Sequence, residues 1–257
     1  NPCNSRQYEN RTGGNPDLGP EESTSWNAGV VWNPIDRLTL SLDYWNIDLK
    51  DQVGTVGLQN ILNIENANNG DPRVTRNPGT GAIILINDSN ANVAGRKEDG
   101  YDFEAEYSFD SAWGTFTQDF TFSYVNKFEI DSGAGAGFND FVEYYLVPQY
   151  RSNLRLGWKQ GDFGATLIGN LIGPNGKEDP AFDGDQTDED RTFPNWVTWD
   201  IQGTYNTPWN GTVTVGVRNM FDKAPPLTND VLSSPFYSNS LYNWLGRVPY
   251  VKYEQRF

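Results

Sequence analysis

Residues Tyr101-Asp102-Phe103-Glu104-Ala105-Glu106-Tyr107-Ser108-Phe109 alternate without exception between apolar residues at odd positions and polar residues at even positions. Because successive side chains of a β-strand point to opposite faces, this segment has one apolar face and one acidic face. The same period of two recurs at residues 38–44, 116–124, 199–205 and 251–257. The pattern predicts an all-β chain built from two-faced strands.

We expect nine such strands, at residues 23–34, 37–50, 98–110, 115–130, 149–159, 162–173, 196–207, 211–222 and 246–257. Many span about 10 to 14 residues, more than the five or six that are usual in globular sheets. A strand tilted by about 45° crosses a bilayer with roughly 9–11 residues. The longest apolar runs, such as residues 82–86, are far too short for a transmembrane helix, so helical membrane spans are excluded.

The connections between these strands alternate in length. Short turns fall at residues 33–36, 110–114, 159–162 and 207–211, and long connections at 51–97, 131–148, 174–195 and 223–245. This alternation is typical of an antiparallel up-and-down transmembrane β-barrel, with tight turns at one rim and long external loops at the other. Trp32, Trp113, Trp158 and Trp209 lie close to the short turns, as expected of an aromatic girdle at a membrane interface.

Composition removes several classes of function. The 257 residues include 34 Asp+Glu against 19 Lys+Arg, no histidine and a single cysteine, and the formal net charge is −15. Catalytic sites and zinc sites that need histidine are therefore excluded, and so are cysteine clusters and a disulfide within the chain. The acidic balance argues against nucleic acid as a partner. Glu104 and Glu106 share a face and could form a glycosidase pair, but a continuous acidic stripe is explained more simply as the lining of a lumen. We expect no enzyme activity and no cofactor.

Four segments carry a resemblance to the C-terminal barrel portion of a TonB-dependent receptor. They read NPDLGPEES at 15–23, LSLDYWNIDLKD at 40–51, GRKEDGYDFE at 95–104 and VRNMFDKAPP at 217–226. Their order and spacing also match that family, so the resemblance covers essentially the whole chain. It implies a barrel of about 22 strands around an N-terminal plug that carries the box engaging TonB.

Residues 1–257 contain no such plug or box and supply only about nine strands. We therefore expect the C-terminal part of a receptor barrel, whose plug and earlier strands are absent here, or a barrel completed by another chain. Asn1 in mid-loop and the unpaired Cys3 favour a fragment, although a free surface thiol at Cys3 is an equal alternative. The resemblance implies as partners outer-membrane lipid, the missing plug and strands, TonB acting through that plug, and an external solute, in the bacterial cell outer membrane.

The function implied by the resemblance is TonB-energised uptake of a scarce solute, such as a siderophore, an oligosaccharide, a peptide or a vitamin. Two alternatives stay open. One is a passive or adhesive outer-membrane barrel. The other is a secreted soluble β-sandwich that acts as a binding module, which would need polar outward faces on its edge strands.

Three sets of candidate site residues follow from these patterns. The polar faces of the strands would line the lumen, through Asp43, Asp102, Glu104, Glu106, Asp119, Asn153, Arg155, Asp200, Gln202, Arg218, Glu254 and Arg256. Any water-filled barrel has a polar interior, so these residues need no individual role. External-loop aromatics would either stack on a ligand or pack the loops together, namely Phe138, Phe141, Tyr144, Tyr145, Phe236, Tyr237, Tyr242 and Trp244. Asp183, Asp185 and Asp188 are a calcium candidate whose spacing does not fit the EF-hand, so a solvated acidic loop is preferred and no metal site is expected.

Overall fold

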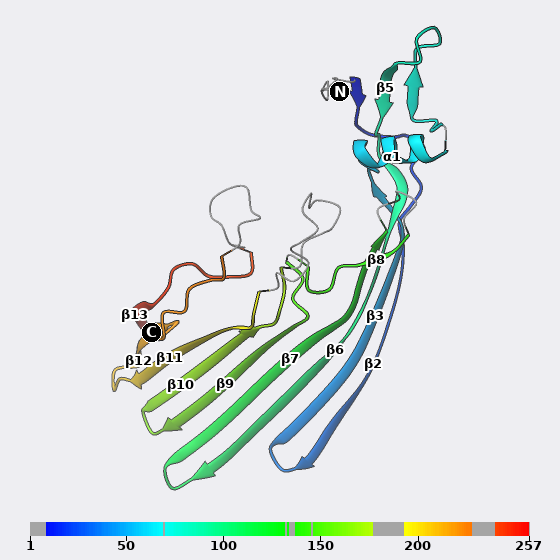
Figure 1. Ribbon diagram of the computed structural model, residues 1–257. Coiled ribbons are helices and arrows are strands. Elements are labelled where there is room, and N and C mark those ends of the chain that lie inside the picture. Colours follow the sequence, from blue (N-terminus) through cyan, green and yellow to red (C-terminus); the bar gives the residue numbers. More distant parts are fainter. Residues whose placement is uncertain are drawn as a thin grey trace. The chain divides into compact units, whose positions relative to one another are not determined.

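The computed structural model describes residues 9–68, 70–131, 133, 137–144, 146–176, 193–227 and 240–256. Within these residues, nine strands follow one another in an up-and-down sheet with the order β2-β3-β6-β7-β9-β10-β11-β12-β13 (Figure 1). Their bounds are β2 Glu22–Ile35, β3 Leu38–Gly54, β6 Ala91–Ser111, β7 Gly114–Asp131, β9 Tyr150–Gln160, β10 Phe163–Ile172, β11 Trp196–Asn206, β12 Gly211–Arg218 and β13 Val248–Gln255. A two-residue strand, β8 Asn139–Asp140, pairs with β7.

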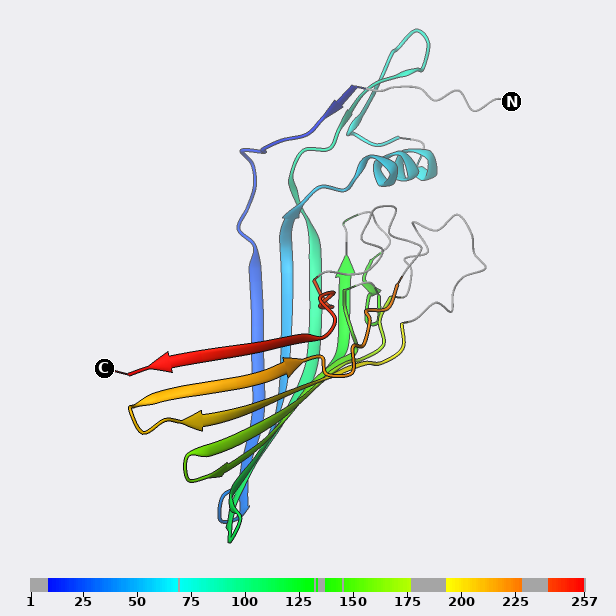
Figure 2. The same ribbon diagram turned by 90° about the vertical axis from the view of Figure 1, so that its left-hand side faces the viewer.

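All nine predicted strands are present, and the differences lie at their ends. β6 begins at Ala91 rather than at residue 98, and the added residues 91–97 do not alternate between apolar and polar. β12 ends at Arg218 rather than 222, because Asn219 adopts a φ of 47° and turns the chain out of the sheet. An open sheet of this kind is one segment of a barrel wall. Figure 2 shows β13 beside β12, at the far end of the order from β2.

The chain divides into two compact units. Unit 1 comprises residues 1–26, 46–99 and 127–141, and unit 2 comprises residues 27–45, 100–126 and 142–257. All four short turns belong to unit 2, where they lie along one edge (Figure 1). Each has a residue with positive φ within it or directly after it, namely Arg37, Gly114, Gly161 and Asn210. Positive φ suits tight hairpins because the turn then matches the right-handed twist of its strands.

One face of the unit 2 sheet is apolar and uncovered. Aromatic rings meet across neighbouring strands on this face, with centroids 6.1 Å apart for Phe103 and Phe120 and 5.0 Å apart for Phe163 and Tyr205. Val251, which belongs to the same face, exposes 73% of its surface. A soluble sandwich would bury such a face, whereas the outer wall of a membrane barrel presents it to lipid.

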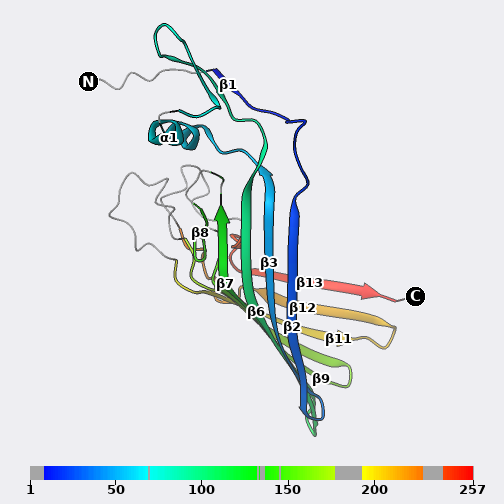
Figure 3. The ribbon, with the colours of Figure 1, turned by 90° about the vertical axis from the view of Figure 1, so that its right-hand side faces the viewer.

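Unit 1 contains structure that the sequence analysis did not foresee. The connection at 51–97, expected as a loop, holds helix α1 Leu58–Asn68 and strands β4 Val74–Arg76 and β5 Ile83–Asn87 (Figures 2 and 3). β5 pairs with β4 on one side and with β1 Glu9–Arg11 on the other.

These elements enclose a small hydrophobic core of Val56, Ile61 and Ile86. Two ion pairs also lie here. Arg73 binds the buried Asp71 through two side-chain nitrogens, and Arg76 donates to Glu65 over 2.7 Å. None of the helices in the described part of the chain is long and apolar enough to cross a membrane.

Candidate ligand-contact site

The opposite face of the unit 2 sheet is polar, and the strand register shows which residues share it. Asp119 of β7 pairs with Arg155 of β9, which pairs with Ile168 of β10, which pairs with Asp200 of β11. The next row joins Gln202 to Gly216 and Tyr250, and Glu254 lies further along. Arg218 belongs to this face because its neighbour Val217 pairs with Ile201 of the apolar face.

Residues of β6 join the same polar face. Phe103 contacts Phe120 on the apolar side, so its neighbours Asp102 and Glu104, and Glu106 beyond them, lie on the side of Asp119. The predicted set Asp102, Glu104, Glu106, Asp200 and Arg218 therefore shares one face. That this face lines a lumen stays a prediction.

A glycine gives this face one of its ordered contacts. The ring of Tyr250 lies over Gly216, where an added Cβ would come within 2.6 Å of it, and the Tyr250 hydroxyl donates to Gln202 Oε1 over 2.8 Å. The Arg218 guanidinium lies 5.5 Å from the centre of the same ring. A single tyrosine of β13 thus spans β12 and reaches β11.

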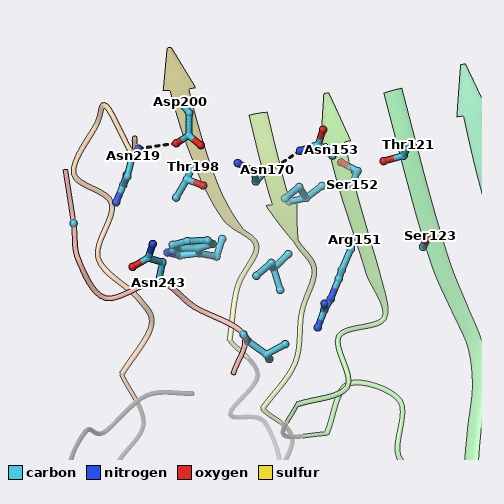
Figure 4. A pocket seen from close by; sticks show the side chains of 15 residues that line it. Thr121, Ser123, Arg151, Ser152, Asn153, Asn170, Thr198, Asp200, Asn219 and Asn243 are labelled. Atoms are coloured by element: carbon cyan, nitrogen blue, oxygen red, sulfur yellow. Dashed lines mark hydrogen bonds between the residues drawn. The ribbon is translucent and has the colours of Figure 1, made fainter. Parts of the chain in front are cut away.

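The polar face has a pocket of about 400 Å³ where the strands approach the long connections (Figure 4). Strands β7, β9, β10 and β11 form its wall, and residues 241–246 of the last long connection complete it. Its labelled polar side chains include Arg151, Asn153, Asn170, Thr198, Asp200 and Asn243. Asn153 and Asp200 were predicted to share the polar face, whereas the pocket itself was not predicted.

Two strands meet in the pocket through a pair of amides. Asn153 Nδ2 donates to Asn170 Oδ1 over 2.7 Å, and these residues are register partners on β9 and β10 (Figure 4). Asn170 is the one polar residue in the otherwise apolar or glycine stretch 167–173. That isolated amide was the available signal for a polar contact, and the sequence analysis missed it.

Apolar side chains pack beside these polar groups, on the same face of the sheet. Ile172, Trp196 and Tyr242 form a buried cluster, in which the rings of Trp196 and Tyr242 meet edge to face with centroids 5.3 Å apart. The buried Asn175 donates from Nδ2 to the Tyr242 hydroxyl over 2.7 Å. Burial raises the pKa of the Tyr242 hydroxyl, so the group stays neutral at physiological pH.

The segment after β12 is held by Asn219, which belongs to the stretch 217–226 that resembles a family motif. Its side chain donates to the carbonyl of Lys223 over 2.9 Å and accepts from the amide of Lys223 over 2.8 Å. Its own amide donates to Asp200 Oδ1 over 2.7 Å. Asp222 then accepts from the amide of Arg247, just before β13. These bonds fix where the chain leaves one strand and enters the next beside the pocket.

The predicted loop aromatics have different surroundings. Tyr242 is only 2% exposed and packs against Ile172 and Trp196 of the sheet, whereas Trp244 is 65% exposed. The Phe138 ring lies 4.1 Å from Lys97 Nζ. Phe141 donates its amide to the Phe128 carbonyl, and Tyr144 accepts from the amide of Val147. Ligand contact by these residues stays a prediction.

Some predicted residues lie outside the described ranges, namely Cys3, Tyr145, Asp183, Asp185, Asp188, Phe236 and Tyr237. Among the residues that the structure does describe, no three acidic, histidine or cysteine side chains cluster as metal ligands.

Comparisons with known proteins agree with this geometry. A family model described as "TonB dependent receptor-like, beta-barrel" matches residues 4–220. No curated protein sequence matches the chain. Among solved structures, the siderophore receptor PirA from Acinetobacter baumannii is 18% identical with a TM-score of 0.60, covering 94% of this chain and 32% of that one. A mutant of the ferric enterobactin receptor PfeA from Pseudomonas aeruginosa is 19% identical with a TM-score of 0.66, at the same coverage of both chains.

The outer membrane transporter YddB from Escherichia coli is 12% identical with a TM-score of 0.55, covering 85% of this chain and 31% of that one. Identities this low show the fold alone, and the chain spans less than two thirds of the length of each of these structures. The family match extends over most of the chain, and it places the protein in the bacterial outer membrane. This chain therefore belongs to the TonB-dependent receptor family and has the β-barrel fold of that family.

Proposed function

We propose that the chain forms part of the barrel of a receptor that takes up an external solute across the outer membrane, with energy supplied through TonB. The main support for this proposal is the two-faced sheet. Its apolar face is uncovered, and its polar face holds a pocket beside the long connections. Family membership and similarity to structures described as siderophore receptors support this proposal. On this proposal the barrel binds and conducts a solute, and none of its residues makes or breaks a covalent bond.

The partners belong to the same proposal. Outer-membrane lipid would cover the apolar face, and a plug inside the complete barrel would contact the polar face and engage TonB. We also propose that residues 1–257 are the C-terminal part of this receptor. The support is that matched receptors are much longer, since the alignment covers only 32% of PirA. Intact mass of the protein from native outer membranes checks this, because a species well above 28.9 kDa is expected.

The test of the function is solute accumulation in cells that carry the full receptor, with and without a functional tonB gene. We expect accumulation to require both the receptor and TonB. Accumulation that needs the receptor and is unchanged without TonB would establish the passive barrel instead. A protein that stays monomeric in water without detergent would establish the soluble module.

A further inference from the structure

We propose that the pocket on the polar face takes an uncharged, polyhydroxylated ligand of the saccharide class. This assignment rests on the proposed uptake function and names the class of solute. It follows from the charge, the hydrogen-bonding groups and the apolar side of the pocket.

The charge of the pocket is balanced. Its lining contains one cation, Arg151, and one anion, Asp200. Asp200 already accepts from the amide of Asn219, which takes up part of its hydrogen-bonding capacity. A strongly charged ligand would meet at most one countercharge here, and it would also meet a like charge. The second hollow of the same face differs, since it holds Arg155 and Lys159 and no carboxylate.

The remaining polar groups of the pocket suit the hydroxyl groups of a ligand. Asn153, Asn170 and Asn243 carry amides, and Thr121 and Thr198 carry hydroxyls, so each can both donate and accept. The bond from Asn153 to Asn170 uses one donor and one acceptor. Asn243 Oδ1 accepts from the backbone amide of Leu245, so each of the three side-chain amides keeps three of its four hydrogen-bonding positions. Paired donors and acceptors on a rigid sheet are what adjacent hydroxyl groups of a sugar ring require.

The pocket also has an apolar side, formed by Ile172, Trp196 and Leu241. A sugar ring has hydroxyls around its edge and C–H groups on its faces, so it needs both kinds of surface. At about 400 Å³ the pocket lies in the range of roughly 300–1,000 Å³ that is usual for small-molecule sites.

The assignment is tested by calorimetry on the full receptor in detergent. The probes are maltohexaose, xylohexaose and mannohexaose, compared with a ferric catecholate chelate, cobalamin and a charged tripeptide. We expect at least one neutral saccharide to bind, and Asn170→Ala and Asn243→Ala each to weaken its Kd by roughly 3- to 10-fold, as for one lost hydrogen bond. Asn206→Ala is the matched control, because Asn206 lies at the other end of β11 and should leave Kd unchanged.

Binding of a charged chelate or peptide with no heat from any saccharide would overturn the assignment. Saccharide binding that is equal in all variants would overturn the location. Asn243 lies in a connection rather than a strand, so its variant tests the pocket even if Asn170→Ala disturbs the barrel. The TonB dependence of uptake is measured in a separate experiment. If no saccharide binds, the ligand assignment is wrong, and the proposed uptake function is still decided by that separate experiment.

Discussion

Replacing Asn219 by alanine is expected to loosen the segment that joins β12 to β13. The variant loses two hydrogen bonds between the Asn219 side chain and the main chain of Lys223, worth about 1 kcal/mol each. It also places alanine at a φ of 47°, which costs an additional ~1 kcal/mol because asparagine tolerates this conformation better. The local opening free energy should fall by about 3 kcal/mol, or roughly a 100-fold increase in the opening equilibrium.

Hydrogen exchange of the folded receptor measures this directly. Peptides covering residues 220–227 and 240–250 should exchange faster, and peptides of the β2–β3 hairpin should not. Asn219→Gly separates the two causes, since glycine accepts positive φ and loses only the hydrogen bonds, about 2 kcal/mol. Unchanged exchange in Asn219→Ala, or a glycine variant that opens more than the alanine variant, would refute the reasoning.

Three further predictions concern other parts of the chain. Gly216→Ala should displace the Tyr250 ring and break its hydrogen bond to Gln202, which lowers the free energy of unfolding by about 1–3 kcal/mol in thermal unfolding. Gly203→Ala is the control and should not lower it, because its Cβ would meet only a backbone oxygen at 3.9 Å. Ile61→Ala removes a fully buried side chain of unit 1 and should cost about 2–5 kcal/mol locally, seen as faster proteolysis within residues 55–90, while the exposed Leu58→Ala serves as control. Hydrogen bonds from Arg73 hold the pKa of Asp71 in the folded protein below its usual value. They therefore stabilise the folded connection at pH values above the unfolded pKa of about 3.9. This contribution is lost as the pH falls through the lower pKa of the folded state. The protection factors of amides in residues 70–76, which correct for the intrinsic pH dependence of exchange, should decrease over that acidic range, and Asp71→Asn should remove this decrease. An Asp71→Asn variant with an unchanged pH profile would exclude the Asp71–Arg73 pair as its cause.

The strands were predictable because one apolar face and one polar face impose a period of two on a strand. Residues 101–109 show this without exception, and all nine strands were found. Helix α1 was not predictable in the same way. Asn60, Asn63, Asn66 and Asn68 are poor helix formers, and an isolated helix of 11 residues is marginal in water. It forms where Ile61 packs against Val56 and Ile86, which is a tertiary effect.

The pocket as a whole could not be predicted from the sequence, although the face on which two of its residues lie could. Asn153 and Asp200 were assigned to the polar face by alternation alone. Bringing Thr121 of β7 and Asn243 of the last connection to one cavity depends on the strand register and on how that connection folds back. The sequence around Thr121 and around Asn243 indicates neither the register nor the path of the connection. Only the three-dimensional structure shows that these two residues lie together.

The small folded unit between β3 and β6 has a consequence for immunological reagents. On α1, Ile61 and Glu65 face inward, and the outward stripe includes Gln59, Asn63 and Asn66. A synthetic peptide of residues 58–68 would present all of these side chains at once, on a chain with little helical structure of its own. Antibodies raised against that peptide would therefore recognise denatured protein on a blot better than the folded protein. Reagents for the native surface need the whole connection, residues 55–90, presented with its core intact.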